Sequence, residues 1–148
     1  MEPHDVEPSI TTPPAPPQRH QRTIRQAATL QGAGLHLGKT CTVRVLPAEP
    51  NCGITFARVD LPGAPEVRAD WRAIAERQRR TALVNGACEV HTIEHLLSAL
   101  RGLAIDNVRI EVDALELPGL DGSALGYVNM LLEADPLEQA VPCRVERL

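Results

Sequence analysis

Aromatic residues are scarce in this chain of 148 residues, which contains one Phe, one Tyr and one Trp. The formal net charge is −4, and no cluster of basic residues is visible along the sequence. A general nucleic-acid-binding protein needs a basic face for the phosphates and aromatic side chains for base stacking. These two deficits argue against nucleic acid as a partner.

Long apolar runs are also missing, because no segment approaches the roughly 18–20 apolar residues that a membrane-spanning helix needs. The first residues have neither the apolar core of a signal peptide nor the Arg-rich pattern of a transit peptide. We therefore predict a cytoplasmic protein without a membrane span. The four cysteines are too widely spaced for a metal-binding knuckle, and no secretory context supports disulfides, so we expect reduced thiols at Cys41, Cys52, Cys88 and Cys143.

The composition changes along the chain and suggests three parts. Residues 1–21 contain six prolines among polar neighbours, which predicts a disordered tail. Residues 22–135 carry the regular apolar patterns of one folded domain, consistent with 43% hydrophobic residues overall. In the last part, residues 136–148, strand-like alternation returns at 143–148, which suggests the beginning of another structural unit.

Alternating and helical patterns within the folded part indicate an α+β protein. Predicted strands lie at residues 23–27, 42–46, 54–59, 81–84, 88–91 and 107–113. Asn85-Gly86 is a strong hairpin signal between two of them. Helical periodicity is present at 92–103 and 124–134, the second with Leu125, Val128, Leu131 and Leu132 as its expected apolar face. We predict a two-layer sandwich of one sheet with two helices packed on one face.

The glycine-rich segment 34–39 does not have the spacing of a phosphate-binding loop. It is better explained as a hairpin connection between strands. His36, within it, is a minor candidate for a site residue.

The segment 92–100 is the most informative in the chain. Its apolar residues form one helical stripe, and Glu94 and His95 lie on the other side, away from the core that the stripe covers. With Thr92 as the N-cap, both residues fall in the first turn, where the helix dipole favours an ionised Glu94 and a neutral His95. Those are the protonation states of a general base and of a metal ligand.

Two other interpretations of this segment remain open at this point. A single histidine in the first turn of a helix is most often a surface or capping residue. Alternatively, His91-Thr92-Ile93-Glu94-His95 matches H-x-x-E-H, the inverted zincin motif, in which His91 and His95 would bind zinc and Glu94 would act as the base.

The sequence resembles the zinc-dependent UDP-3-O-acyl-N-acetylglucosamine deacetylases of lipid A biosynthesis over about residues 22–134. The matching blocks, in order, are GAGLHLGK (32–39), TIEHLLSAL (92–100), GLAIDN (102–107), IEV (110–112) and ELPGLDGSA (116–124). The resemblance implies the first of the two similar domains that these enzymes contain, and UDP-3-O-acyl-N-acetylglucosamine as the substrate.

The resemblance also implies residue roles. It makes Glu94 the catalytic base and His95 a ligand of a Zn²⁺ ion between two domains, whereas His91 is not in the family's ligand set. The family's other ligands lie on an H-x-x-x-D helix in the second domain, and this pattern is absent from the sequence. Residues 136–148 resemble the start of the crossover into that domain. A complementary second deacetylase domain is therefore an expected partner.

Three functional hypotheses follow from the sequence. The chain is the amino-terminal half of a deacetylase that needs a second domain, or a non-catalytic module that retains the fold and binds a nucleotide sugar or a partner. The third hypothesis is a self-contained metalloprotease built on His91 and His95.

Overall fold

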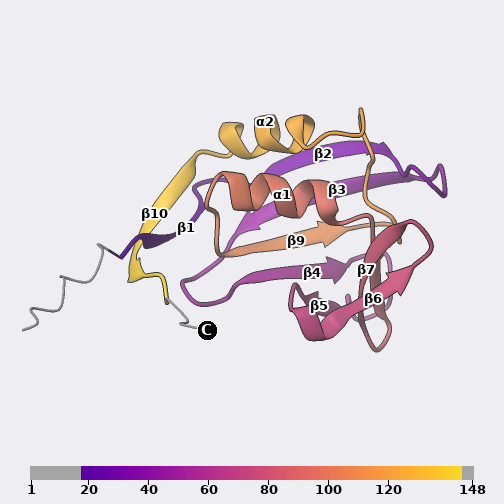
Figure 1. Ribbon diagram of the computed structural model, residues 1–148, viewed down its shortest axis with the longest axis horizontal. Coiled ribbons are helices and arrows are strands. Elements are labelled where there is room, and N and C mark those ends of the chain that lie inside the picture. Colours follow the sequence, from indigo (N-terminus) through magenta and orange to yellow (C-terminus); the bar gives the residue numbers. More distant parts are fainter. Residues whose placement is uncertain (1–17, 145–148) are drawn as a thin grey trace, which may run out of the picture.

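A five-stranded mixed sheet forms the centre of the computed structural model, which describes residues 18–144 (Figure 1). The strand order is β2-β3-β9-β4-β5, and β9 pairs antiparallel with β3 and parallel with β4. The strands are β2 (Ala28–Ala33), β3 (Thr40–Pro47), β4 (Ile54–Arg58), β5 (Glu66–Arg68) and β9 (Val108–Val112).

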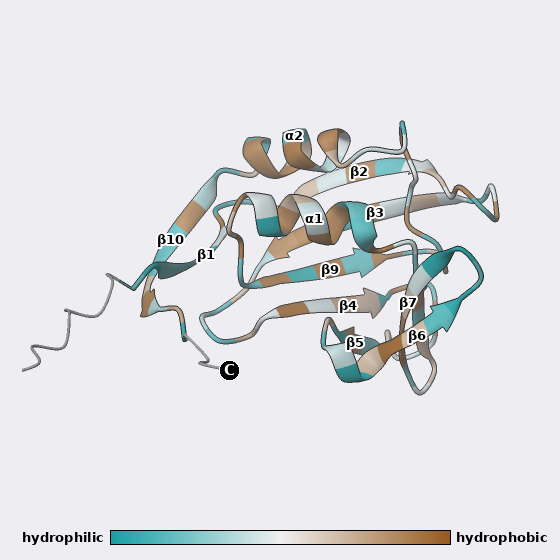
Figure 2. Ribbon diagram, viewed as in Figure 1, coloured by the Kyte–Doolittle hydropathy of each residue, from teal (hydrophilic) through white to brown (hydrophobic). Residues whose placement is uncertain are grey.

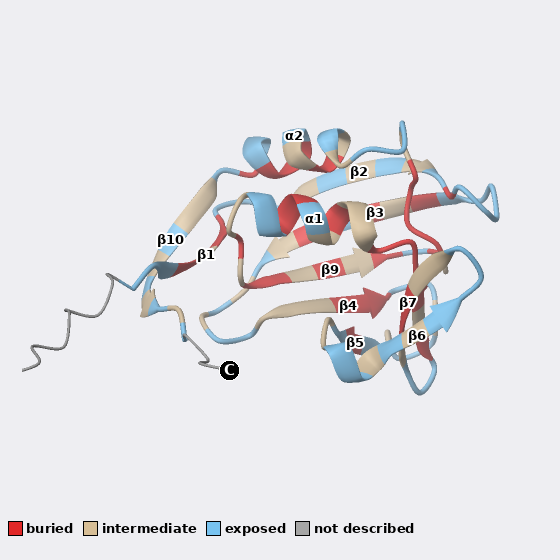
Figure 3. Ribbon diagram, viewed as in Figure 1, coloured by how far each residue is buried: buried red, intermediate tan, exposed pale blue. Residues whose placement is uncertain are grey.

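Alternation in the sequence gives this sheet one apolar and one polar face. In β9, Val108, Ile110 and Val112 are buried, whereas the intervening Arg109 and Glu111 are only partly covered (Figure 3). Because successive side chains point to opposite faces of a strand, the three apolar residues share one face. On the other face, charged side chains pair between neighbouring strands, as Arg44 and Glu111 do at 3.4 Å.

Two helices, α1 (Glu94–Gly102) and α2 (Leu125–Glu133), cover the apolar face of the sheet (Figure 1). The core between the layers contains fully buried side chains from the sheet and both helices, among them Val43, Val45, Phe56, Leu96, Leu100, Ile110, Tyr127 and Leu131. The predicted α+β class, with both helices on one face of a sheet, is confirmed. Among residues 18–144, no helix is long and apolar enough to cross a membrane.

The buried face of α2 differs from the predicted one. Tyr127, Met130 and Leu131 are buried, together with Ala134 just beyond the helix. Leu125 and Leu132, which the sequence placed in the core, are 58% and 53% exposed. The helix is apolar around most of its circumference (Figure 2), so periodicity alone could not decide which side faces the sheet.

The remaining strands form two smaller sheets beside the main one, instead of the single sheet predicted. Strands β6 (Ile74–Arg77), β7 (Arg80–Asn85) and β8 (Cys88–His91) form a three-stranded antiparallel sheet. The predicted Asn85-Gly86 hairpin is confirmed between β7 and β8, where Gly86 has a φ of 56°. The third strand of this small sheet, β6, follows a short 3₁₀ helix at Trp71–Ala73. The sequence predicted no definite element in this segment.

The third sheet joins the two ends of the described chain, because β1 (His20–Ile24) pairs with β10 (Pro136–Pro142). Strand β1 begins inside the segment predicted as a tail, and Gln21 is buried, with hydrogen bonds to Asn51 and to the carbonyl of Pro142. In the final segment, residues 143–144 follow the strand and are not part of it. The predicted disorder at 1–17 and the predicted strand at 145–148 lie outside the described residues.

Tyr127 links α2 to the segment after β9. Its side chain is fully buried, and its hydroxyl donates a hydrogen bond to the carbonyl of Pro118 at 2.7 Å. We expect Tyr127→Phe to lower the free energy of unfolding by about 1–2 kcal/mol, because a buried carbonyl loses its partner. Urea denaturation measures this difference. Leu125→Ala, an exposed change on the same helix, should shift stability by less than about 0.5 kcal/mol. Equal losses of stability in the two variants would contradict the role assigned to the Tyr127 hydroxyl.

Candidate active site

The chain passes from β8 to α1 through two residues, and the first of them has an unusual backbone conformation. Thr92 has a φ of +57°. This left-handed region is a genuine outlier for a β-branched residue and costs on the order of 1–3 kcal/mol. The surrounding structure therefore has to hold Thr92 in place. One such contact is the hydrogen bond that its N–H donates to the carbonyl of Thr81 in β7, at 3.1 Å.

Thr92 is not the N-cap of α1, contrary to the prediction. The helix begins at Glu94, the N-cap position is occupied by Ile93, and no side chain caps the helix there. The Thr92 hydroxyl instead donates to Glu116, with 2.9 Å between its Oγ1 and the Oε1 of that carboxylate. A hydrogen bond to an ionised carboxylate is stronger than the neutral bond that a hydroxyl oxygen makes to a helix N–H as a cap. The Thr92 hydroxyl therefore contacts the distant Glu116 and does not cap the helix.

Glu94 lies at the start of α1 and is half-buried. Its Oε1 accepts a hydrogen bond from the backbone N–H of Thr81 at 2.5 Å. Burial acts to raise the pKa of Glu94, but the hydrogen bonds from its own N–H and from Thr81 outweigh it, and the pKa is lowered from its ordinary value of 4.5. Glu94 is therefore ionised at neutral pH and able to accept a proton.

His95 follows directly and is also half-buried. Its Nδ1 is inaccessible to solvent and has no hydrogen-bond partner among residues 18–144. The pKa of the nearby Asp121 carboxyl is lowered, mainly by hydrogen bonds from Ser123 and to a smaller extent by His95. The structure thus places an ionised carboxylate and an imidazole side by side at the amino end of α1.

The inverted zincin interpretation is wrong, because His91 and His95 do not share a helix. His91 is the last residue of β8, is 4% exposed, and its Nε2 lies 2.6 Å from the Oε1 of Glu89. Two histidines bind one ion in that motif only when they lie one turn apart on the same helix face. His91 Nδ1 is buried without a partner, like that of His95, but His91 is held by Glu89 within the sheet.

Glu116 is the site residue that sequence reasoning did not single out. Its side chain is 2% exposed, and besides Thr92 its carboxylate accepts hydrogen bonds from the backbone N–H groups of His36 and Leu37. These bonds close the connection between β2 and β3, as predicted for residues 34–39. They use the backbone of His36, whose side chain is exposed. The sequence feature that could have identified Glu116 is its position as an acidic residue between two leucines, Leu115 and Leu117.

The residues of this site do not form a complete metal centre. Among residues 18–144, no group of three or more His, Cys, Asp or Glu side chains could hold a metal ion. A catalytic zinc ion takes three protein ligands and one water. The half-buried imidazole of His95 can supply one ligand, and the described residues supply no complete set.

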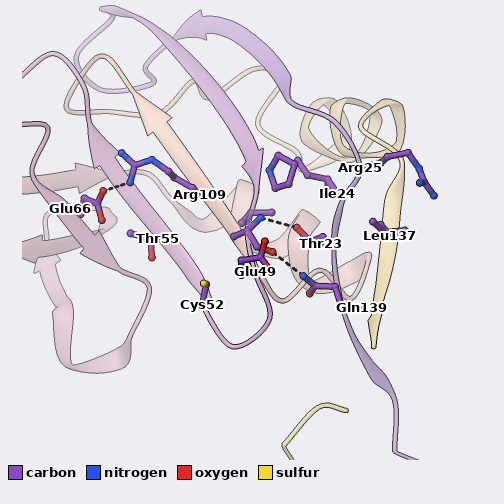
Figure 4. A pocket seen from close by; sticks show the side chains of 13 residues that line it. Thr23, Ile24, Arg25, Glu49, Cys52, Thr55, Glu66, Arg109, Leu137 and Gln139 are labelled. Atoms are coloured by element: carbon purple, nitrogen blue, oxygen red, sulfur yellow. Dashed lines mark hydrogen bonds and ion pairs between the residues drawn. The ribbon is translucent and has the colours of Figure 1, made fainter. Parts of the chain in front are cut away.

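A cavity of about 580 Å³ lies elsewhere, on the side of the main sheet near β1 and β10 (Figure 4). Its lining includes the ion pair of Glu66 and Arg109, and Thr23, which accepts a hydrogen bond from the N–H of Ala48 at 3.1 Å. Neither Glu94 nor His95 lines it. The cavity is therefore separate from the candidate pair at the start of α1.

Comparison with known protein families matches residues 21–148 to LpxC, described as UDP-3-O-acyl N-acetylglycosamine deacetylase. The chain belongs to this family. The match covers the described elements except the first residue of β1, and it includes the start of α1 that carries Glu94 and His95.

Several curated members of the deacetylase family are similar to this chain, and each is named UDP-3-O-acyl-N-acetylglucosamine deacetylase. The protein of Shewanella denitrificans is 46% identical over 121 residues, those of Psychrobacter sp. and Trichormus variabilis 44% over 122 and 121. The alignments cover 81–82% of this chain but 40–43% of the relatives. The chain thus spans about two fifths of the length of the relatives that it matches.

The lowered pKa of Glu94 predicts a pH-dependent contribution to stability. A carboxyl whose pKa is lower in the folded than in the unfolded chain stabilises the fold above its unfolded pKa, and this stabilisation is lost as pH falls through the folded pKa. We expect Glu94→Gln to be less stable than wild type at pH 7, and the difference to shrink below the ordinary value of 4.5. Urea denaturation at pH 7 and at successively lower pH measures it. A difference that is independent of pH would contradict the assigned ionisation.

Proposed function

We propose that this chain supplies the catalytic base and one zinc ligand of a deacetylase that hydrolyses the N-acetyl group of UDP-3-O-acyl-N-acetylglucosamine in lipid A biosynthesis. The observation that carries the proposal is the adjacent pair at the start of α1: an ionised Glu94 held by the N–H of Thr81, and the half-buried imidazole of His95 beside it. Membership of the deacetylase family and the names of its curated relatives support the substrate.

Glu94 is assigned the proton transfer. Hydrolysis of an acetamide adds water across the carbon–nitrogen bond, releasing acetate and a free amine on the sugar. The attacking water must lose a proton, and Glu94 Oε2 is available for it because Oε1 is bound to Thr81. The same carboxyl then returns the proton to the departing amine. A positioned base of this kind contributes about 10²–10⁴-fold to the rate.

His95 is assigned to zinc. The ion, when bound, would supply Lewis acidity toward the acetamide carbonyl. Because His95 provides one of three required protein ligands, the other two must come from residues outside the described part of this chain or from another chain.

A second deacetylase domain is the proposed source of the missing ligands. The relatives are more than twice as long as the region that this chain matches. The outer side of α2 also exposes Leu125 and Leu132, two turns apart on one helix face. Apolar residues that line up on one exposed face are expected where another domain packs.

A non-catalytic module is the second candidate function. It is favoured by one observation, the incomplete ligand set among residues 18–144. Such a module would keep the fold and the exposed face of α2 but would not form an active enzyme with any second domain.

Reconstitution distinguishes the two candidates. We expect deacetylase activity when the carboxyl-terminal domain of a close relative is added to this chain, or fused after Leu148. Glu94→Gln should leave zinc bound while kcat falls by about 10²–10⁴-fold, the contribution of a general base. His95→Ala should reduce both zinc content and kcat, because it removes a ligand. Acetate release and metal analysis measure these effects.

His91→Ala serves as the matched histidine control in this experiment. It should change zinc content and kcat little, since His91 contacts Glu89 within the small sheet. Activity that survives Glu94→Gln unchanged would contradict the catalytic assignment. A folded chain that is inactive with every second domain tested would favour the non-catalytic module.

A further inference from the structure

The carboxylate of Glu116 is buried at the junction of three segments that are distant in sequence. Its Oε1 accepts hydrogen bonds from the Thr92 hydroxyl at 2.9 Å and from the N–H of His36 at 3.0 Å, and its Oε2 accepts one from the N–H of Leu37 at 2.8 Å. Burial acts to raise the pKa of Glu116, but the bonds from Leu37, His36 and Thr92 outweigh it and lower the pKa. A charged, nearly inaccessible carboxylate therefore lies beside the turn that precedes α1.

The backbone around Glu116 is attached to the same turn. The N–H of His91 donates to the carbonyl of Leu115 at 2.8 Å, and the N–H of Leu117 donates to the carbonyl of His91 at 3.1 Å. Both bonds adjoin Thr92, so the segment 115–117 contacts the turn through its main chain as well as through its carboxylate. The position of Glu116 relative to Thr92 is therefore fixed at three points.

The connection 34–39 packs directly on this carboxylate. A Cβ atom at Gly34 would overlap Glu116 Oε2, so only glycine fits there. The connection also closes on itself, through a hydrogen bond from the N–H of Gly34 to the carbonyl of Lys39 at 3.0 Å. It leaves the Glu116 side chain little room to move away from Thr92.

The conformation of Thr92 decides where Glu94 and His95 lie. The left-handed backbone at Thr92 turns the chain from β8 into α1, and it allows Glu94 to meet the N–H of Thr81 on the neighbouring strand. A β-branched residue such as threonine rarely adopts this conformation, and the surrounding structure has to hold it there. Its hydroxyl is held by Glu116 and its N–H by Thr81.

We propose that Glu116 is a positioning residue that acts through the Thr92 hydroxyl to hold Glu94 and His95 in their reactive arrangement. The inference rests on the proposed function of that pair. Glu116 itself does not touch substrate. Its contribution is to keep a strained turn closed, so that the catalytic carboxylate stays bound to Thr81.

Two substitutions at Thr92 test the hydroxyl. Thr92→Val keeps the shape of the side chain and removes the bond to Glu116, whereas Thr92→Ser keeps the bond. In the reconstituted enzyme we expect Thr92→Val to lower kcat by about 10–100-fold, as a small misplacement of a catalytic group does. KM should stay within about twofold, because the loss falls on the transition state. Thr92→Ser should restore kcat to within about threefold of wild type.

Thr23→Val is the matched control. Thr23 is also a buried threonine, and its hydroxyl donates to the carbonyl of Asn107 at 2.6 Å, in β1 and away from Glu94. Thr23→Val removes a buried hydroxyl, with its bonds to Asn107 and Ala48, and should destabilise the chain, yet leave kcat within about twofold of wild type. Glu116→Gln is the second variant should Thr92→Val fail to fold, and it should lower kcat in the same direction.

A second readout needs no activity and uses this chain alone. Hydrogen exchange of the Thr81 amide reports the bond to Glu94 directly. We expect exchange at Thr81 to be about tenfold faster in Thr92→Val or Glu116→Gln than in Thr23→Val at equal global stability. Equal Thr81 exchange in these variants would overturn the inference, whether or not activity is reconstituted.

The two proposals fail in different ways. If Glu94→Gln keeps full activity, the proposed function is wrong. If Glu94→Gln is inactive while Thr92→Val and Thr23→Val have the same kcat, the function stands and the positioning role of Glu116 is wrong.

Discussion

One buried carboxylate joins the parts of this protein that surround the candidate site. Glu116 binds the β2–β3 connection through two backbone N–H groups and the turn before α1 through the Thr92 hydroxyl. Burying a charge is costly unless hydrogen bonds compensate for it, and here three donors from two other segments do so. Because these donors are 24 or more residues away from Glu116 along the chain, the carboxylate holds segments that are distant in sequence together beside the candidate site.

The hydrophobic core between the sheet and the helices determines where the candidate site lies. The face of α1 that carries Leu96 and Leu100 packs on the sheet, and this orients the helix. Glu94 and His95 then lie outside the core, on the rim where β7 and the turn meet. Stability and chemistry are thus divided between two sides of one short helix. The apolar side fixes its axis, and the polar side presents a carboxylate and an imidazole.

Local signals in the sequence were sufficient for much of this fold. Asn85-Gly86 identified the β7–β8 hairpin, and the alternation of residues 108–112 identified β9, because both depend on neighbouring residues only. The pairing of β1 with β10 could not be predicted, since it joins segments more than 110 residues apart. For α2, apolar residues on both sides of the helix left its buried face undetermined.

The residues of the candidate site also divide into those that local sequence patterns identify and those that they do not. Glu94 and His95 were identified because they are adjacent and lie opposite an apolar stripe. Thr81 and Glu116, which hold this turn, lie 13 and 24 residues away from their partners Glu94 and Thr92. Thr92 was misread as an N-cap because the local rule could not include a distant, stronger acceptor.

Zinc binding by this chain alone tests most directly whether the site is one half of a metal centre. Isothermal titration of the purified chain at neutral pH should show no stoichiometric binding at low-micromolar zinc, because His95 leaves the ion two protein ligands short. Binding of one equivalent at low-micromolar affinity, lost in His95→Ala, would contradict this account.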